Sequence, residues 1–410
     1  MTINEPVTAT SEFDHHSPEF RDEPYQAISE MRAKCPVQHS KLYGGFWSLL
    51  DYQSVFDAAR DDDVWGSYPS IGIPPAPIVY PLPPIESDPP MTQKLRKITI
   101  GHFSPAQTER LRPRVQEMIT ALVDAFIEKG ECDIVADLTN PLPARVALHL
   151  LGFDESKYQQ WVDWIHAIVH DKTHEPEKAQ NANTELMTEI TRHVVERRER
   201  GDSGDDLFGA IMDGKIDDKP LDDATINMYT LMIMLGGMDT TSGLTGNSLV
   251  YMLSHPEVRQ ELIDNPDLLP DATEEFLRHS TPTLGLGRNV RCDLELHGQS
   301  LKAGDKAFLM WGAANRDPEM FENPDMVDLH RSNSKRHLAF GVGMHRCLGS
   351  TLARMMFQEM MSQILTRLPD FELNGEPVRF EDAGEVYAVR HLPIRFTPGP
   401  RVGSTAEVHN

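Results

Sequence analysis

The sequence predicts a mainly α-helical protein with a minor β-sheet region, folded as one large domain. Three observations predict this class. The segment 222–254 contains no proline and begins with acidic residues, so it is long enough for one helix of about 50 Å. Other stretches repeat apolar residues at helical spacing. Only residues 287–318 combine the apolar–polar alternation and glycine turns that are typical of short strands.

The length of the chain and the absence of linker-like segments determine how many domains we expect. At roughly 150 residues per domain, a chain of 410 residues would hold about two to three domains. However, no Gly/Ser linker, internal repeat or low-complexity block marks a boundary. We therefore expect one domain over residues 16–398, between a flexible N-terminus at residues 1–15 and a flexible C-terminal tail at residues 399–410.

The first clear helix is expected in residues 112–130. Gly130 stands where a residue just beyond a helix C-terminus would stand. The apolar face of this helix is predicted to hold Val115, Met118, Ile119, Leu122 and Phe126.

The middle of the segment 222–254, LMIMLGGMDTTSGLTGNSLVYML, is apolar enough to be compared with a membrane span. Asp239, Asn247 and the hydroxyl residues between them break the apolar run well short of about 18 residues. We therefore expect a buried central helix. Two shorter helices, bounded by prolines, are predicted in residues 255–266 and 268–282.

The last predicted helix lies in residues 349–370, directly after Cys347, and its core face holds Leu352, Met356, Met360 and Ile364. Cys347 is thereby placed at a helix N-terminus, where backbone N–H groups stabilise a thiolate that could bind a metal. A buried structural cysteine is the ordinary alternative for such a residue. A Cys–His nucleophile pair with His345 is a second alternative, but the sequence shows no acid placed to orient that histidine.

Composition narrows the class of function. A net charge of −24 argues against nucleic acid and anionic membranes as partners. The four cysteines form no C-x-x-C pair, so we expect reduced thiols and no zinc or iron–sulfur site. The first residues have neither a basic start nor an apolar run, so we expect no signal peptide or membrane anchor and a cytoplasmic location.

The segment FGVGMHRCLG, at residues 340–349, carries a resemblance to a known family. It matches F-G-x-G-x-H-x-C-x-G, the haem-binding loop of the cytochrome P-450 superfamily. The matching residues are Phe340, Gly341, Gly343, His345, Cys347 and Gly349.

The resemblance implies a fold and a set of cofactors. It implies the cytochrome P-450 fold, a single large triangular domain with a long central I helix, as a monomer of the soluble bacterial type. Haem b (iron protoporphyrin IX) would be bound with Cys347 as the iron ligand, whose thiolate favours O–O cleavage. Phe340, Gly341, Gly349 and Gly236 would lie against the haem. O2 would be the co-substrate, with NAD(P)H electrons delivered by a separate ferredoxin and its reductase, since no reductase is visible in the chain.

Glu275 and Arg278 match the family's E-x-x-R, and Arg331 is the expected third member of its Glu–Arg–Arg network. The two residues of the motif lie one helical turn apart, so they can pair. A surface ion pair of little energetic value is the alternative for such a spacing. The resemblance implies a structural role.

Arg96, Arg288 and His345 match the family's partners of the haem propionates. Two carboxylates must be held by local cations or donors in an acidic protein. A solvated surface role is the alternative for either arginine taken alone. The family also places a histidine four residues before the first arginine, where this chain has Thr92, and that puts one propionate contact in doubt.

The central segment GGMDTTS resembles the family's oxygen-activation motif. Gly236 and Gly237 would leave room for O2 beside the haem, although helix packing alone could explain them. Thr240 is implied to hydrogen-bond the reacting oxygen and Asp239 to relay protons. A salt-bridged buried acid without relay duty is the alternative for Asp239.

The resemblance therefore implies a haem–thiolate monooxygenase that inserts one oxygen atom from O2 into a C–H bond of a neutral lipophilic molecule, a terpenoid, steroid or aromatic compound. Peroxide-driven members of the superfamily usually carry Arg–Pro in place of the acid–alcohol pair, which this chain lacks. A haem–thiolate sensor would need an effector domain, and none is visible. Product formation that depends on NAD(P)H and redox partners would separate the three alternatives.

The neutral-substrate prediction rests on residues 61–93, which contain no Lys or Arg and match the part of the family that covers the substrate pocket. An unpaired buried carboxylate there would be costly. A Pro-rich surface loop is the alternative. The expected pocket residues are Ile71, Ile73, Ile78, Val79, Leu82, Leu235, Leu284 and Leu286.

A basic face is expected near the cysteine loop, despite the acidic composition, and would attract an acidic ferredoxin. Its members would be Lys94, Arg96, Lys97, Lys335, Arg336, Arg346 and Arg354. An ordinary solvated charged face is the alternative.

Overall fold

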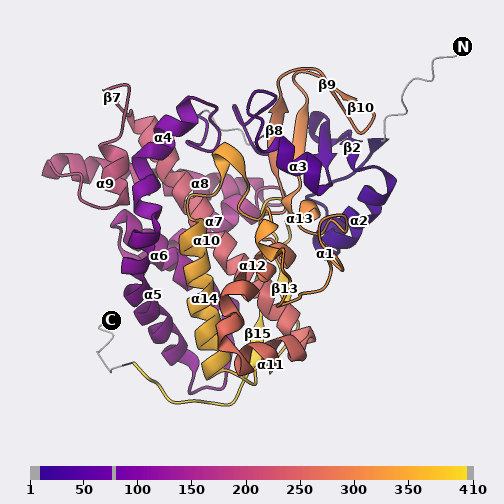
Figure 1. The fold of residues 1–410 in the computed structure, drawn as a ribbon. Coiled ribbons are helices and arrows are strands. Elements are labelled where there is room, and N and C mark those ends of the chain that lie inside the picture. The colour runs from indigo at the N-terminus through magenta and orange to yellow at the C-terminus, as the bar shows by residue number, and fades with distance from the viewer. Residues whose placement is uncertain (1–9, 76–79, 404–410) are drawn as a thin grey trace, which may run out of the picture.

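The computed structural model describes residues 10–75 and 80–403 and is dominated by helices (Figure 1). The helices are α1 Pro18–Asp22, α2 Pro24–Lys34, α3 Tyr52–Ala58, α4 Met91–Thr99, α5 Pro105–Phe126, α6 Pro141–Leu151, α7 Tyr158–His170, α8 Pro176–Arg200, α9 Leu207–Met212, α10 Asp223–Ser254, α11 Pro256–Asp264, α12 Leu269–His279, α13 Trp311–Ala314 and α14 Ser350–Arg367. The short helical turns η6 Ser334–Arg336 and η7 Gly343–His345 precede the cysteine.

The strands are short and form several small sheets. They are β1 Thr10–Ser11, β2 Val37–Ser40, β3 Phe46–Leu49, β4 Trp65–Gly66, β5 Glu131–Asp133, β6 Lys215–Ile216, β7 Lys219–Pro220, β8 Leu286–Val290, β9 Leu294–Leu296, β10 Gln299–Leu301, β11 Lys306–Leu309, β12 Glu372–Leu373, β13 Val378–Arg379, β14 Val389–His391 and β15 Pro393–Arg395. The main sheet has the order β1-β2-β3-β11-β8-β4. In Figure 1 the labelled strands β2, β8, β9 and β10 lie with α1–α3 on the right, apart from the mass of helices.

The central helix α10 runs through the middle of the molecule, beside α14 (Figure 1). Its N-terminus is capped by Asp222, whose carboxylate accepts a hydrogen bond from the Thr225 amide at 2.8 Å, and Pro256 follows its last turn. Every residue from Thr241 to Leu249 is buried, so this half of the helix is enclosed on all sides. The prediction of a buried central helix is confirmed.

The fold class is confirmed, and most predicted elements are present. The helices expected in 255–266 and 268–282 are α11 and α12, and the strands expected in 287–318 are β8–β11. The helix expected in 112–130 begins earlier, at Pro105, where Ser104 caps it, and ends at Phe126. Gly130 has a φ of +75° in the turn that follows, a conformation that favours glycine.

The core consists of two large helical clusters and two smaller ones beside the main sheet. The apolar face predicted for α14 lies in the cluster shared with α5, α10 and α12. Register in the sheet pairs Phe308 of β11 with both Ser48 and Gly287, and this fixes the neighbouring Arg288 on β8.

Two details concern the ends of the domain. Residues 10–15 were assigned to a flexible segment, but β1 pairs with β2 and His15 is buried there. Near the other end, the amides of Val402 and Gly403 donate to Asp124. Within residues 10–75 and 80–403, no helix combines the length and the apolar character that crossing a bilayer requires.

Candidate active site

The cysteine loop folds tightly between η7 and α14. The Cys347 amide donates to the Phe340 carbonyl oxygen at 2.8 Å, which closes the loop on itself. Gly341 and Gly343 have φ values of +63° and +77°. At Gly343 a Cβ atom would come within 2.6 Å of the Ala59 carbonyl oxygen, so only glycine fits this close approach. The glycines of the motif therefore let the loop pack against α3 while it holds the thiol in place.

The Cys347 thiol is exposed, yet burial raises its pKa. The residue is therefore accessible although protein atoms surround its sulfur densely. The Gly349 amide and Arg96 act in the opposite direction and lower the pKa, as the sequence led us to expect of a helix N-terminus, but the cost of desolvation is larger. The expected stabilisation of the thiolate by the helix terminus is therefore present but does not lower the pKa of the thiol below its ordinary value.

Arg96, Arg288 and His345 lie in one neighbourhood. Burial, together with the charges of Arg288 and Arg96, lowers the pKa of His345 to about 3. Arg288 is only 3% exposed, and burial lowers its pKa to about 10 against the opposing effect of Asp62 and Asp88. Its guanidinium donates to the Gly287 carbonyl oxygen at 2.8 Å. Arg96 donates to the Arg346 carbonyl oxygen at 2.7 Å.

This arrangement fits the group that the sequence predicted. A buried guanidinium with no carboxylate at ion-pair distance among the described residues is unfavourable unless an anion reaches it. The propionates of a haem are such anions, and the exposed Cys347 thiol lies close enough to Arg96 for the two to interact electrostatically. The residues present therefore fit haem. Thr92 does not take the place of the missing histidine, because its hydroxyl is buried and donates to the Ser87 carbonyl oxygen at 2.6 Å.

The middle of α10 carries the residues that match the oxygen-activation motif. Gly236 is exposed and Thr240 partly exposed in a helix whose following residues are buried. A Cβ atom at Gly236 would meet only the flexible end of Met232, at 3.4 Å, so the backbone borders open space. The Thr240 hydroxyl donates to the Gly236 carbonyl oxygen at 3.0 Å and remains accessible.

Asp239 points the other way, toward α7. Its side chain is 1% exposed, and Oδ2 lies 2.6 Å from Nε2 of His170 while Oδ1 lies 3.5 Å from Nε2 of His166. Burial alone would raise the pKa of Asp239, but the two histidines hold it well below its ordinary value. Asp239 is therefore an ionised, paired acid whose carboxylate is engaged by α7.

Glu275, Arg278 and Arg331 form one buried cluster. Arg278 donates to both carboxylate oxygens of Glu275, at 2.7 and 2.8 Å, and Arg331 does so at 3.0 and 3.1 Å. Arg278 also donates to the carbonyl oxygens of Asn315 and Met326. The cluster thus fixes α12 to the chain that leads into the cysteine loop.

The predicted pocket residues that the structure describes differ in burial and in the core cluster they join. Ile73 and Leu284 are buried in the core cluster beside the main sheet, where protein contacts occupy their side chains, and Leu82 is buried among the helices. Leu235 is half-buried beside that helical cluster. Two more candidates are half-buried, Ile71 and Leu286, and two lie outside the described residues, Ile78 and Val79.

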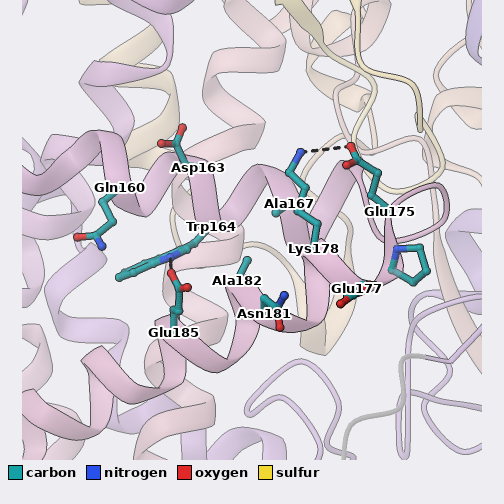
Figure 2. Close-up of a pocket in the computed structure, with 11 residues that line it drawn as sticks. Gln160, Asp163, Trp164, Ala167, Glu175, Glu177, Lys178, Asn181, Ala182 and Glu185 are labelled. Atoms are coloured by element: carbon teal, nitrogen blue, oxygen red, sulfur yellow. Dashed lines mark hydrogen bonds and ion pairs between the residues drawn. The ribbon is translucent and has the colours of Figure 1, made fainter.

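A separate cavity of about 890 Å³ lies between α7 and α8 (Figure 2). Its lining is acidic: it includes Asp163, Glu177 and Glu185, and the Trp164 indole N–H donates to Glu185 at 2.8 Å. None of the predicted site residues lines it. This cavity is therefore distinct from the cysteine site.

The basic face is smaller than predicted. Lys94 is paired with Asp217, Lys335 with Asp271, and Arg354 with Glu274, all acids that are distant in sequence. Arg96 is turned to the Arg346 carbonyl oxygen. Within the described part of the chain, the members that form no ion pair are Arg96, Lys97, Arg336 and Arg346. The last two line a hollow of about 340 Å³ with Phe340 and Gly341 of the cysteine loop.

Sequence reasoning missed His166 and His170. Both lie on α7, which was not predicted as an element, and they face the one acid that was predicted to carry protons. The signal in the sequence was WVDWIHAIVH, an apolar helical repeat that carries two histidines one turn apart. Nothing in the sequence pairs them with α10.

Comparison with known proteins identifies the family of the chain. Residues 83–394 match the family model described as Cytochrome P-450. The chain is 32% identical over 384 residues to a steroid C26-monooxygenase of Mycolicibacterium smegmatis, which covers 92% of this chain and 94% of that protein. Among solved structures, CYP109E1 from Bacillus megaterium in complex with testosterone superposes with a TM-score of 0.83 at 28% identity, covering 93% of this chain and 99% of that chain. CYP268A2 from Mycobacterium marinum in complex with pseudoionone gives 0.87 at 26% identity, with coverages of 96% and 100%.

Proposed function

The chain belongs to the cytochrome P-450 family, and from this premise we propose that it inserts one oxygen atom from O2 into a C–H bond of a neutral lipophilic molecule. It is a cytochrome P-450 monooxygenase, an oxidoreductase that uses haem iron, O2 and electrons from NAD(P)H supplied through redox partners. The single observation that carries the proposal is the exposed Cys347 thiol, held on a closed loop within electrostatic reach of Arg96.

The protein's part in this reaction is to bind, orient and deliver protons. Cys347 would hold the iron of a bound haem, and Arg96, Arg288 and His345 would bind its propionates with charge-assisted hydrogen bonds. The haem, when bound, supplies the chemistry of O2 activation and electron transfer. Glu275, with its two arginines, keeps the segment before the cysteine loop in position.

Thr240 and Asp239, which are neighbours on α10, have different proposed roles. The Thr240 hydroxyl borders the open side of the helix and can hydrogen-bond the reacting oxygen. Asp239 lies one residue earlier, on the buried side, where it exchanges protons with groups on α7. The pairing of Asp239 with histidines supports proton delivery, because imidazole, unlike guanidinium, can release its proton near neutral pH.

A neutral lipophilic substrate of the steroid, terpenoid or simple aromatic class fits both the chain and its relatives. Residues 61–93 contain no Lys or Arg that could neutralise a carboxylate. The relatives include a steroid C26-monooxygenase, and the solved structures hold testosterone and pseudoionone, which are uncharged.

The test of this function is a panel of ligands presented to the haem-loaded enzyme. Neutral steroids and terpenoids are expected to shift the spin state of the iron and to be hydroxylated when NAD(P)H, a ferredoxin and its reductase are all present. Omission of any one of the three should abolish product. Strong and selective shifts by carboxylic acids would contradict the neutral-substrate proposal, and product formed with peroxide alone at the same rate would contradict the use of O2.

Thr240→Ala is expected to keep consuming NAD(P)H while diverting most of it to hydrogen peroxide, because the hydroxyl that hydrogen-bonds the reacting oxygen is lost. Asp239→Asn is expected to slow turnover by about 100-fold, the lower end of the usual range for a general acid. Product and peroxide formed per NAD(P)H are the measurements.

Thr240→Ser is the matched control, because it retains the hydroxyl and should retain most of the coupling. If Thr240→Ala and Asp239→Asn both kept the wild-type rate and the wild-type yield of product, the acid–alcohol pair would have no role in proton delivery.

Electrons are proposed to enter from a ferredoxin that docks beside the cysteine loop. The hollow lined by Arg336 and Arg346 contacts Phe340 and Gly341, so it offers a short path to Cys347. Its unpaired cations would attract an acidic partner although the whole chain carries −24.

Lys97→Glu combined with Arg336→Glu should slow reduction by ferredoxin about tenfold at low ionic strength, because oppositely charged faces accelerate association. The difference should shrink as salt screens the encounter. Stopped-flow reduction at several salt concentrations measures the effect. Lys129→Glu, a single charge reversal beyond the C-terminal end of α5, is the control for position and should leave the rate unchanged. Equal rates for the double variant and the wild type at low salt would mean that the donor docks elsewhere.

A further inference from the structure

The carboxylate of Asp239 is bracketed by two histidines of one helix. His170, the last residue of α7, is 0% exposed and lies 2.6 Å from Oδ2, whereas His166, one turn earlier, is 19% exposed and lies 3.5 Å from Oδ1. Each carboxylate oxygen therefore has its own imidazole, and the two imidazoles differ in their access to solvent.

The buried histidine is held between two acceptors. Its Nε2 faces the Asp239 carboxylate, and its Nδ1 lies 3.1 Å from the carbonyl oxygen of Asp382. A neutral imidazole has one N–H only, so it cannot satisfy both acceptors. His170 must carry both protons, or else Asp239 must carry one of them. Between them the two residues therefore retain one proton inside the protein.

Other groups around His170 favour the doubly protonated imidazole. Burial alone would lower the pKa of His170, but the Asp239 and Asp382 charges outweigh it and raise the pKa. The ring stacks on Phe380, with centroids 3.7 Å apart and planes within 7°. Asp382 is in turn bound by His16 and by Thr173, so it is not free to move toward His170. Lys172, which lies beside Thr173 in the loop after α7, is paired with Glu385.

We propose that α7 supplies Asp239 with a two-histidine relay, in which His170 fixes the carboxylate and His166 restores its proton from solvent. The inference rests on the proposed role of Asp239 in proton delivery. In the relay, doubly protonated His166 transfers its Nε2 proton to Oδ1 of the ionised Asp239, Asp239 gives that proton up toward the Thr240 side, and His166 regains a proton at Nε2 from solvent. One proton thus passes from solvent to the site, and Asp239 and His166 return to their starting charges.

Histidine suits both positions, 166 and 170, for a chemical reason. Arginine or lysine in place of the histidines would hold the carboxylate equally well but would not release a proton near neutral pH. Histidine does both, because imidazole ordinarily titrates in that range. His166 and His170 act through Asp239 and are therefore positioning residues.

The first test measures protonation directly, without a variant and without turnover. The reduced carbonyl complex is diamagnetic, so the imidazole nitrogens of ¹⁵N-histidine-labelled protein can be followed by NMR as the pH is changed. His170 is expected to remain doubly protonated across the neutral range. In Asp239→Asn, which removes the counter-charge, His170 should lose one proton and become neutral. A His170 that is neutral in the wild type with an ionised Asp239 would overturn the proposal.

The second test separates the relay from a structural role. His166→Gln retains size and a hydrogen-bonding group but cannot carry a proton; turnover should fall about tenfold, less than for loss of the acid itself. The solvent deuterium isotope effect on turnover should rise, and the limb of the pH profile that falls with rising pH should disappear. His174→Gln, an exposed histidine just after α7, is the control and should match the wild type in all three measurements.

The outcomes of the two proposals are distinguishable. If Asp239→Asn slows turnover but His166→Gln leaves the isotope effect and the pH profile unchanged, the relay through α7 is wrong and the acid retains its role. If Asp239→Asn itself behaves as the wild type, the proton-delivery part of the proposed function is wrong.

Discussion

Cys347→Ser is expected to leave a protein that folds or nearly folds but has lost the spectrum of a thiolate-ligated haem. The loop is closed by backbone hydrogen bonds and by its glycines, and serine differs from cysteine by one atom, so the backbone can remain in place. A hydroxyl does not replace the electron donation of a thiolate to the iron. The reduced carbonyl complex of the wild type should absorb far to the red of a His-ligated haem, and that band should be absent in the variant.

Cys292→Ser is the matched control. Cys292 is also an exposed cysteine, in the short turn between β8 and β9, and its replacement should leave the spectrum unchanged. An unchanged red-shifted band in Cys347→Ser would show that another residue holds the iron, and the assignment of the site would be wrong.

Glu275→Gln should destabilise the folded protein strongly. The carboxylate is shared by Arg278 and Arg331, and all three groups are buried. Removal of one partner from a buried charge cluster costs about 3–5 kcal/mol, because the remaining charges stay uncompensated. That is a large part of the roughly 5–15 kcal/mol by which a folded protein is stable. The midpoint of urea unfolding and the yield of haem-loaded protein measure the effect.

The chain offers a matched pair for comparison. Glu109 and Arg112 have the same residue types at the same spacing, three apart on a helix, but on the surface of α5. Glu109→Gln should leave the unfolding midpoint unchanged within error, because solvent screens such pairs. If the two glutamine variants unfolded at the same urea concentration, the buried cluster would not stabilise the fold.

The sequence was sufficient for the parts of the site that local chemistry determines. The glycines, phenylalanine and cysteine of the loop lie within ten residues, and the pattern alone predicts a tight turn before a helix. The helix α10 was equally predictable, because it depends on a long apolar run without proline. In both cases the residues that make the structure are neighbours in sequence.

Features that depend on distant partners could not be predicted. Lys94 and Lys335 were expected to be free cations, yet Asp217 and Asp271 neutralise them through contacts that only the folded chain creates. Leu284 was expected to line a pocket, but the packing of the main sheet takes it into the core. An alternation of apolar residues predicts that a side chain is inward-facing, not which of several interior spaces it faces.

The histidine cluster around Asp239 has a consequence for how this chain reaches its native state. His170 and Asp239 are 69 positions apart, His170 and Asp382 are 212 apart, and His16 and Asp382 are 366 apart. Closing loops of this length costs chain entropy that is repaid only when most of the molecule is already compact. The helices can form early from local contacts, whereas the proton relay must wait for both ends of the chain to arrive. During refolding, coupled turnover is therefore expected to recover only after both ends of the chain have joined the core.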